Sequence, residues 1–264
     1  MYYLQYFGLT HDPLGNHVIL PLTQYADLEK KLNFLLQTKG IGLITGSSGT
    51  GKTTALRRWS KTLNPLTHQT IYQSDNHFSA FDIYSQLAES LGLEKCHRCC
   101  KLWRCLKEGL LEMYDQKQLS TIWVLDEAHK LSTNFLLELP SFLNFSFDSR
   151  PILTIILCGT SSIQSILRRA AYDATASRIH FSFEWKAIDD KAQFSKIIDQ
   201  AFTNAGKTEK IMADSAIDLM CIASKGRLRY ASRIITQALI IATEKNINHL
   251  SDEVIQQAIE GLQI

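Results

Sequence analysis

The front of the chain alternates short apolar runs with longer amphipathic stretches. Several runs are apolar at almost every position, as expected of strands buried on both faces of a parallel sheet. They are also rich in β-branched and aromatic residues. They predict strands at Ile41–Thr45, Thr70–Ser74, Thr121–Asp126, Ile152–Gly159 and Arg178–Trp185. Helical patterns between them cover Thr53–Leu63, Ala80–Leu91, Lys101–Gln116, Asn134–Leu143 and Ser162–Ala170. This alternation predicts an α/β fold with a doubly wound sheet.

The strand pattern ends near Asp189, and only helical patterns follow it. They cover Lys191–Ala205, Asp214–Ala223, Tyr230–Thr243 and Asp252–Leu262. We therefore predict an α/β domain over residues 1–187 and a small all-helical domain over residues 188–264.

The composition is that of an ordinary globular protein, with 264 residues, 45% hydrophobic and 20% charged. A formal net charge of +2 neither requires nor excludes a nucleic-acid partner. The start, MYYLQYFGLTHDPLG, lacks the features of a signal peptide, and the longest apolar run, ILTIILC, is too short to cross a membrane. We expect a cytoplasmic protein with no membrane partner and with reduced cysteines.

The stretch GSSGTGKTT follows the first predicted strand and opens the first predicted helix. It fits G-x-x-x-x-G-K-S/T, the pattern of a phosphate-binding loop. Its members are Gly46, Ser47, Ser48, Gly49, Thr50, Gly51, Lys52, Thr53 and Thr54. Backbone N–H groups of such a loop face phosphates, Lys52 is expected to reach the β- and γ-phosphates, and the Thr53 hydroxyl to bind Mg²⁺. The alternative is a plain glycine-rich turn.

The stretch TIWVLDEAHK ends its apolar strand in two acids. Asp126 is expected to hold the Mg²⁺ shell, and Glu127, one residue further, to act as the general base for an attacking water. The alternative is a turn that caps the next helix. The chain has no N-K-x-D stretch of the guanine-specific kind, so ATP is the expected nucleotide.

These motifs resemble those of AAA+ ATPases, with GSSGTGKTT similar to Walker A and VLDEAHK similar to Walker B. The stretch YFGLTHDP near the start, together with DEAH, resembles the ExeA-type family, which includes a secretion component and phage Mu B-like transposition helpers. The resemblance implies a parallel five-stranded P-loop domain with a helical lid. We expect the segment 1–38 to pack on the nucleotide site.

The resemblance also implies two further residues of the hydrolytic site. Thr160, after the strand ILTIILCG, matches sensor 1, which contacts the γ-phosphate or the lytic water; a helix cap is the alternative. Arg178 in ASRIHFSF matches the arginine that reaches into a neighbouring subunit's nucleotide. Arg168 and Arg169 are rivals for this role, and an ordinary surface arginine is the alternative.

The stretch KGRLRYAS resembles the G-x-P-R segment of sensor 2, with Leu228 in place of the proline. Gly226 and Arg229 match that segment, and Arg227 is also available.

For partners, the resemblance implies a homo-oligomer in the form of a ring or a helical filament. It further implies binding to double-stranded DNA without strong sequence specificity, and recruitment or activation of a transposase. An ExeA-type secretion-pathway ATPase and a nucleotide-gated protein-recruitment switch are the alternatives.

The stretch EKCHRCCKLWRCLK gathers cysteines and basic residues. We favour packed thiols over zinc, because a second, distant ligand pair is absent from the sequence. Its basic side chains fit either a DNA backbone or a solvated helix face: Lys95, Arg98, Lys101, Arg104 and Lys107. A second candidate DNA segment, QSDNHFSAFD, offers Asn76 and His77.

Overall fold

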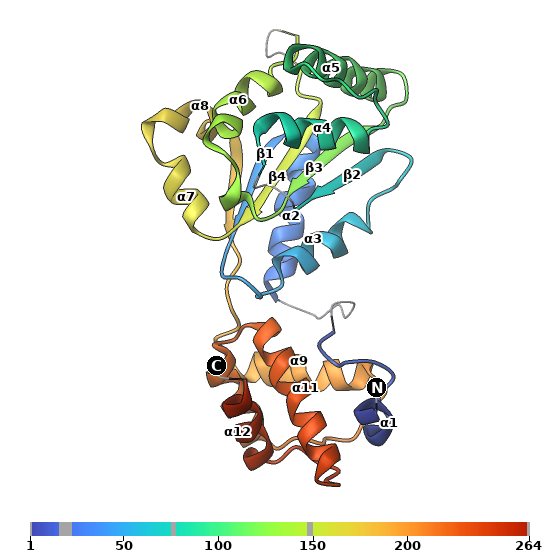
Figure 1. The fold of residues 1–264 in the computed structure, drawn as a ribbon, viewed down its shortest axis with the longest axis vertical. Coiled ribbons are helices and arrows are strands. Elements are labelled where there is room, and N and C mark those ends of the chain that lie inside the picture. Colours follow the sequence, from blue (N-terminus) through green and yellow to red (C-terminus); the bar gives the residue numbers. More distant parts are fainter. Residues whose placement is uncertain (1, 16–22, 75–77, 147–149, 263–264) are drawn as a thin grey trace. The chain divides into compact units, whose positions relative to one another are not determined.

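A computed structural model describes residues 2–15, 23–74, 78–146 and 150–262 (Figure 1). The chain forms two compact units, each with its own hydrophobic core. The sheet unit comprises Ala26–Gly46 and Ala55–Trp185. The helical unit comprises Met1–Tyr25, Ser47–Thr54 and Lys186–Ile264.

The sheet unit is built on five parallel strands in the order β2-β3-β4-β1-β5. The strands are β1 (Gly40–Thr45), β2 (His68–Gln73), β3 (Ser120–Leu125), β4 (Leu153–Gly159) and β5 (Ile179–Glu184). Every residue of β4 is buried, as a central parallel strand requires. Thr45 pairs with Gly159, and Leu125 with Leu157, so the carboxyl ends of β1, β3 and β4 share one edge. The predicted parallel five-stranded α/β fold is confirmed.

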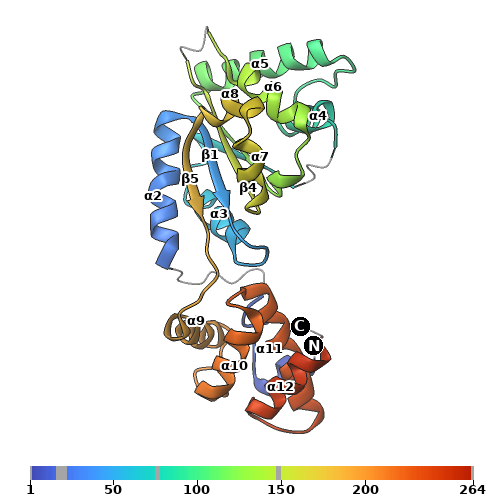
Figure 2. The same cartoon turned by 90° about the vertical axis from the view of Figure 1, so that its left-hand side faces the viewer.

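Helices cover both faces of this sheet (Figure 2). One side carries α2 (Thr23–Thr38) and α3 (Lys52–Ser60), and the other carries α4 (Ala80–Ser90), α5 (Cys99–Asp115) and α6 (Thr133–Leu143). Aromatic rings fill the core on the α4–α6 side, where Tyr84, Trp123, Phe135 and Phe142 contact one another. Shorter helices follow β4: α7 (Ser162–Leu167), η2 (Ala170–Tyr172) and α8 (Asp173–Ala176).

Local polar chemistry sets several helix starts in this unit. Ser79 and Asp82 form a reciprocal capping box at α4, and the Ser132 hydroxyl accepts the Phe135 N–H at α6. The predicted helix Thr53–Leu63 ends earlier, at Ser60, ahead of Asn64 and Pro65, a pair that disfavours helix.

Several predicted strand boundaries were wrong by one or two residues, and two of these differences affect candidate site residues. Asp126 lies just beyond β3 because the next residue, Glu127, turns into a left-handed conformation. Arg178 lies just before β5, where its carbonyl accepts the Ile41 N–H.

The helical unit packs α9 (Lys191–Asn204), α10 (Asp214–Ser224), α11 (Leu228–Glu244) and α12 (Asp252–Gly261) around one core. A short N-terminal helix, α1 (Tyr2–Phe7), joins that core through Tyr3 and Phe7. The sequence patterns predicted neither α1 nor α2. The division at residue 187 and the packing of segment 1–38 on the nucleotide site stay predictions. Within the described residues, no helix combines the length and apolar character needed to span a bilayer.

Candidate active site

The phosphate loop starts at the edge where β1, β3 and β4 end. The Gly46 N–H donates to the Gly159 carbonyl at 3.2 Å, and the Trp185 N–H donates to the Thr45 carbonyl at 2.6 Å. A Cβ at Gly46 would lie 2.1 Å from the Trp185 carbonyl oxygen, which no side chain can tolerate. The backbone just after β5 leaves no room for a side chain at the first residue of the motif, which explains the glycine there.

The loop itself folds around the Lys52 side chain. The Lys52 Nζ donates to the Ser47 carbonyl at 2.8 Å, and the residue is only 8% exposed. The Thr50 hydroxyl donates to the same carbonyl at 2.8 Å, and Gly49 has a φ of +79°. A buried ammonium inside a loop of unusual backbone angles fits a phosphate ligand, whose oxygens accept the same hydrogen bonds. Thr53 is an exposed residue at the start of α3.

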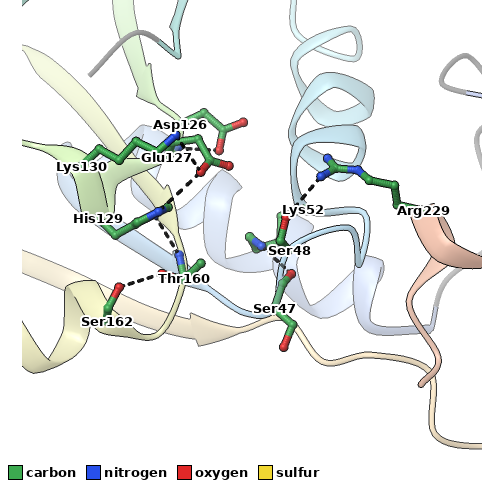
Figure 3. A network of polar contacts seen from close by, with 10 residues as sticks. All are labelled: Ser47, Ser48, Lys52, Asp126, Glu127, His129, Lys130, Thr160, Ser162 and Arg229. Carbon is green, nitrogen blue, oxygen red and sulfur yellow. Dashed lines mark hydrogen bonds and ion pairs between the residues drawn. The ribbon is translucent and has the colours of Figure 1, made fainter. Parts of the chain in front are cut away.

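Arg229 at the start of α11 contacts the same loop (Figure 3). Its N–H donates to the Gly49 carbonyl at 3.0 Å, and its Nη1 donates to the Ser48 hydroxyl at 3.2 Å. Arg227 instead donates to the Ser224 carbonyl and stacks over the Tyr230 ring. Of the two arginines in KGRLRYAS, the structure brings Arg229 to the phosphate loop.

Asp126 is a buried carboxylate with both oxygens occupied. It is 4% exposed; its Oδ1 accepts the Glu127 N–H at 2.9 Å and its Oδ2 accepts the Tyr72 hydroxyl at 2.9 Å. Burial, followed by the neighbouring Asp126 charge, raises the pKa of Tyr72 above its usual value. The phenol thus remains a neutral donor at physiological pH. Sequence reasoning missed Tyr72, because a tyrosine at the end of β2 gives no motif.

Glu127 occupies a strained backbone position directly after Asp126. Its φ of 53° and ψ of 36° are left-handed, which is uncommon for a residue other than glycine and clusters at functional sites. Its side chain is 44% exposed, and its Oε2 lies 3.5 Å from His129 Nε2 and 3.7 Å from Lys130 Nζ. A polarised, accessible carboxylate of this kind can accept a proton from water.

Thr160 follows β4 at the same edge. Its hydroxyl lies 2.7 Å from the Ser162 hydroxyl, and its N–H donates to His129 Nδ1 at 3.5 Å. The next helix, α7, starts after Ser161 and has no side-chain cap. Ser161 occupies the N-cap position of α7, and Thr160 contributes to this helix start only its carbonyl, which accepts the Ile163 N–H.

Arg178 lies at the amino-terminal end of the strands, whereas Glu127 and Thr160 lie at their carboxyl ends. It precedes β5, which starts beside the start of β1, where Ile179 pairs with Ile41. Its Nη1 donates to the Ala174 carbonyl at 3.4 Å. Arg168 and Arg169 are exposed after α7. The sheet of one chain therefore separates Arg178 from that chain's own Glu127.

The cysteine-rich stretch forms a packed thiol pair. The Cys96 Sγ lies 3.6 Å from the Cys105 Sγ, while Cys99 and Cys100 are exposed. The described part of the chain holds no cluster of three or more His, Cys, Asp or Glu side chains suited to a metal.

Two of the basic side chains proposed to face DNA, Lys107 and Lys95, make contacts within the chain. Lys107 Nζ donates to the Ser141 and Asn144 carbonyls at the end of α6, so this lysine satisfies helix carbonyls. Lys95 pairs with Glu89. Asn76 and His77 lie outside the described residues.

The sheet order, the phosphate-loop motif that follows β1 and the two acids that follow β3 define a P-loop protein of the AAA+ class. A family profile described as an AAA domain matches residues 35–167, half of the sequence, and the chain belongs to this family. The motif resemblance to AAA+ ATPases is thereby confirmed at the level of the family. No curated protein matches the chain.

Solved structures show the same fold at low identity. The chain is similar to Aeropyrum pernix ORC2 in its ADPNP-ADP complexes, with 18% identity and a TM-score of 0.72 over 96% of this chain and 72% of that one. It is also similar to A. pernix ORC1 in complex with DNA, with 16% identity and a TM-score of 0.68 over 97% and 69%. For the Thermotoga maritima RuvB Holliday junction branch migration motor, identity is 17% and the TM-score 0.58 over 90% and 69%.

Two tyrosine variants separate the role of the Tyr72 hydroxyl from general packing. Tyr72→Phe removes a donor from the buried Asp126 and is expected to lower the unfolding free energy of the sheet unit by about 1–2 kcal/mol. Tyr84→Phe is the control, because the buried Tyr84 hydroxyl has no hydrogen-bond partner within the described ranges. Its removal is expected to be neutral or stabilising.

Urea unfolding followed by tryptophan fluorescence measures both changes, since all four tryptophans belong to the sheet unit: Trp59, Trp103, Trp123 and Trp185. Equal destabilisation by the two variants would contradict the assignment of Tyr72 as a support of Asp126.

Proposed function

We propose that this chain is an ATPase that binds ATP at the Gly46–Thr54 loop and hydrolyses it to ADP and phosphate. The observation that carries the proposal is Glu127, a half-exposed carboxylate in a left-handed turn next to the buried Asp126. Both acids lie at the sheet edge from which the loop departs. The similar A. pernix ORC2, seen with ADPNP and ADP, supports nucleotide binding.

In this proposal the phosphates take the place of the Ser47 carbonyl as the partner of Lys52. Loop N–H groups, from Gly46 to Thr54, bind the phosphate oxygens. Thr53 and Asp126 would hold Mg²⁺, which supplies charge neutralisation at the phosphates when bound.

Hydrolysis follows from the properties of two residues. Glu127 accepts a proton from a water molecule as the water oxygen attacks the γ-phosphorus, and the bond to the β–γ bridging oxygen breaks to release ADP. Thr160 offers its hydroxyl to the γ-phosphate or the attacking water. Because the sequence has no guanine-specific motif, we expect ATP to be preferred over GTP.

The remaining arginines divide into two roles. Arg229 contacts the loop of its own chain and is proposed to sense the bound nucleotide. Arg178 lies at the far edge of its own sheet, so its proposed role is to neutralise phosphoryl charge at a neighbouring subunit's site. Arg168 and Arg169 remain rivals for that role. The active unit is then a homo-oligomer, either a ring or a helical filament.

We infer that the oligomer assembles on double-stranded DNA in its ATP state, recruits or activates a transposase, and is released by hydrolysis. Two of the similar structures support a DNA partner, since one is bound to DNA and another is a branch migration motor. The resemblance of YFGLTHDP and DEAH to ExeA-type transposition helpers supports the transposase.

A nucleotide-gated recruitment switch with slow turnover is the second candidate. The contact of the Glu127 carboxylate with the half-buried His129 favours it, because this contact competes with a water molecule for the same oxygen. An ExeA-type secretion-pathway ATPase is the other interpretation of the same motifs, and absence of DNA binding would favour it.

Two substitutions test the catalytic assignments. Lys52→Ala removes the loop's ammonium and is expected to weaken ATP binding about 30-fold or more. Glu127→Gln is expected to retain ATP binding and lower kcat by about 10²- to 10⁴-fold, because the amide cannot accept the proton. Lys61→Ala changes an exposed lysine just beyond α3 and is the matched control.

Binding of a fluorescent ATP analogue and phosphate release measure the two effects. Unchanged affinity in Lys52→Ala would contradict the phosphate-loop assignment. Wild-type turnover in Glu127→Gln would remove the general base from the proposal, and a wild-type protein without turnover would favour the switch.

Mixing two inactive variants tests whether Arg178 acts between subunits. Arg178→Ala is expected to retain ATP binding and to lose turnover by about 10³-fold. A mixture of Arg178→Ala with Glu127→Gln should regain phosphate release, since the Glu127→Gln subunit supplies the arginine and its neighbour supplies the base. Arg168→Ala and Arg169→Ala, mixed in the same way, test the rivals. Failure of every mixture to recover activity would contradict a trans-acting arginine.

A further inference from the structure

His129, the last residue of DEAH, links the two elements that carry Glu127 and Thr160. It lies in a short turn, η1 (Ala128–Lys130), that follows Glu127 directly. Its Nδ1 accepts the Thr160 N–H at 3.5 Å and its Nε2 lies 3.5 Å from Glu127 Oε2 (Figure 3). One ring thus spans from the residue after β4 to the proposed general base after β3.

The two contacts require one tautomer of the ring. Because Nδ1 accepts a hydrogen bond from a backbone N–H, it must carry a lone pair. The ring proton of neutral His129 is then on Nε2, where it can be donated to the Glu127 carboxylate. The backbone contact with Thr160 therefore selects which ring nitrogen faces Glu127 with a proton.

The fit between the turn and the end of β4 is tight enough to hold this ring in place. A Cβ at Gly159 would lie 3.2 Å from the backbone nitrogens of Ala128 and His129 and 3.3 Å from His129 Nδ1. The absence of a side chain at Gly159 lets the turn approach the strand. The His129 side chain is only 21% exposed, against 44% for Glu127 and 52% for Lys130.

Lys130 contacts the same Glu127 oxygen at 3.7 Å but from an exposed position. An exposed ion pair of this kind is screened by water and contributes little. The orientation of Glu127 thus depends on the half-buried imidazole that is itself tied to Thr160.

We propose that His129 is a positioning residue for Glu127, whose ring is oriented by the Thr160 N–H so that Nε2–H holds the carboxylate in its working direction. Any shift of Thr160 against β4 is passed to Glu127 through this ring. The residue after β4 and the general base then respond together at one nucleotide. This inference rests on the proposed ATPase activity.

Three substitutions at His129 separate the two ends of the link. His129→Ala removes both contacts and is expected to lower kcat about tenfold or more with an unchanged KM for ATP. His129→Gln keeps an amide donor that reaches toward Glu127 and should recover part of the loss. His129→Asn keeps an acceptor near the Thr160 N–H but falls short of Glu127, and should resemble His129→Ala. Lys130→Ala is the matched control, with a change in kcat below about threefold.

A double variant provides the decisive measurement. If His129 acts through Glu127, His129→Ala should cause no further loss of phosphate release in a Glu127→Gln background. The inference would be overturned if the losses in kcat of the two single variants multiplied in the double variant. It would also be overturned if His129→Ala left kcat unchanged or raised KM, or if His129→Gln and His129→Asn were equally active. Thermal melting of each variant identifies losses due to unfolding, and recovery in folded His129→Gln excludes that cause.

The same series distinguishes this inference from the proposed function. If Glu127→Gln turns over ATP like the wild type, the ATPase proposal fails and the positioning role fails with it. If Glu127→Gln is inactive and His129→Ala is fully active, only the positioning role fails.

Discussion

The parallel register of β1, β3 and β4 is the constraint on which the candidate site depends. It brings the ends of three strands to one edge, so that the loop at Gly46, the acids after Leu125 and the polar residue after Gly159 meet there. Backbone hydrogen bonds fix the arrangement before any side chain contributes: Gly46 donates to Gly159, and Trp185 donates to Thr45. Because strands this central are buried on both faces, their residues have little freedom except at that edge. Chemistry is therefore confined to the positions where the strands stop.

The two acids after β3 show how one edge can support two roles. Asp126 is buried and accepts hydrogen bonds from a phenol and a backbone N–H, which fix the geometry of its carboxylate. Glu127 is half exposed, strained in its backbone and held by contacts that a ligand can rearrange. A fixed carboxylate suits a cation, and an accessible one suits proton transfer. Asp126 and Glu127 differ in exposure and contacts because the backbone turns at Glu127, directly after Asp126.

The sequence predicted the sheet, because apolar runs and the spacing of GSSGTGKTT and VLDEAH are local signals. It also placed Asp126 and Glu127 after one predicted strand and, through the family resemblance, Thr160 after another. It could not predict Tyr72 or His129, since their significance lies in hydrogen bonds to residues 54 and 31 positions away. Helix α1 was missed for a similar reason: six residues carry too little periodicity, and the helix depends on the tertiary core that Tyr3 and Phe7 enter. Local patterns predict elements, and pairing across the sheet decides which side chains support the site.

We propose that the nucleotide state of this chain controls its affinity for DNA. The most direct measurement is fluorescence anisotropy of random-sequence duplex DNA with no nucleotide, with ADP and with a non-hydrolysable ATP analogue, each at two salt concentrations. We expect tight binding with the analogue alone, weakened by salt as phosphate contacts require, and lost in Lys52→Ala. Binding of equal strength in all three states, or none in any, would contradict it.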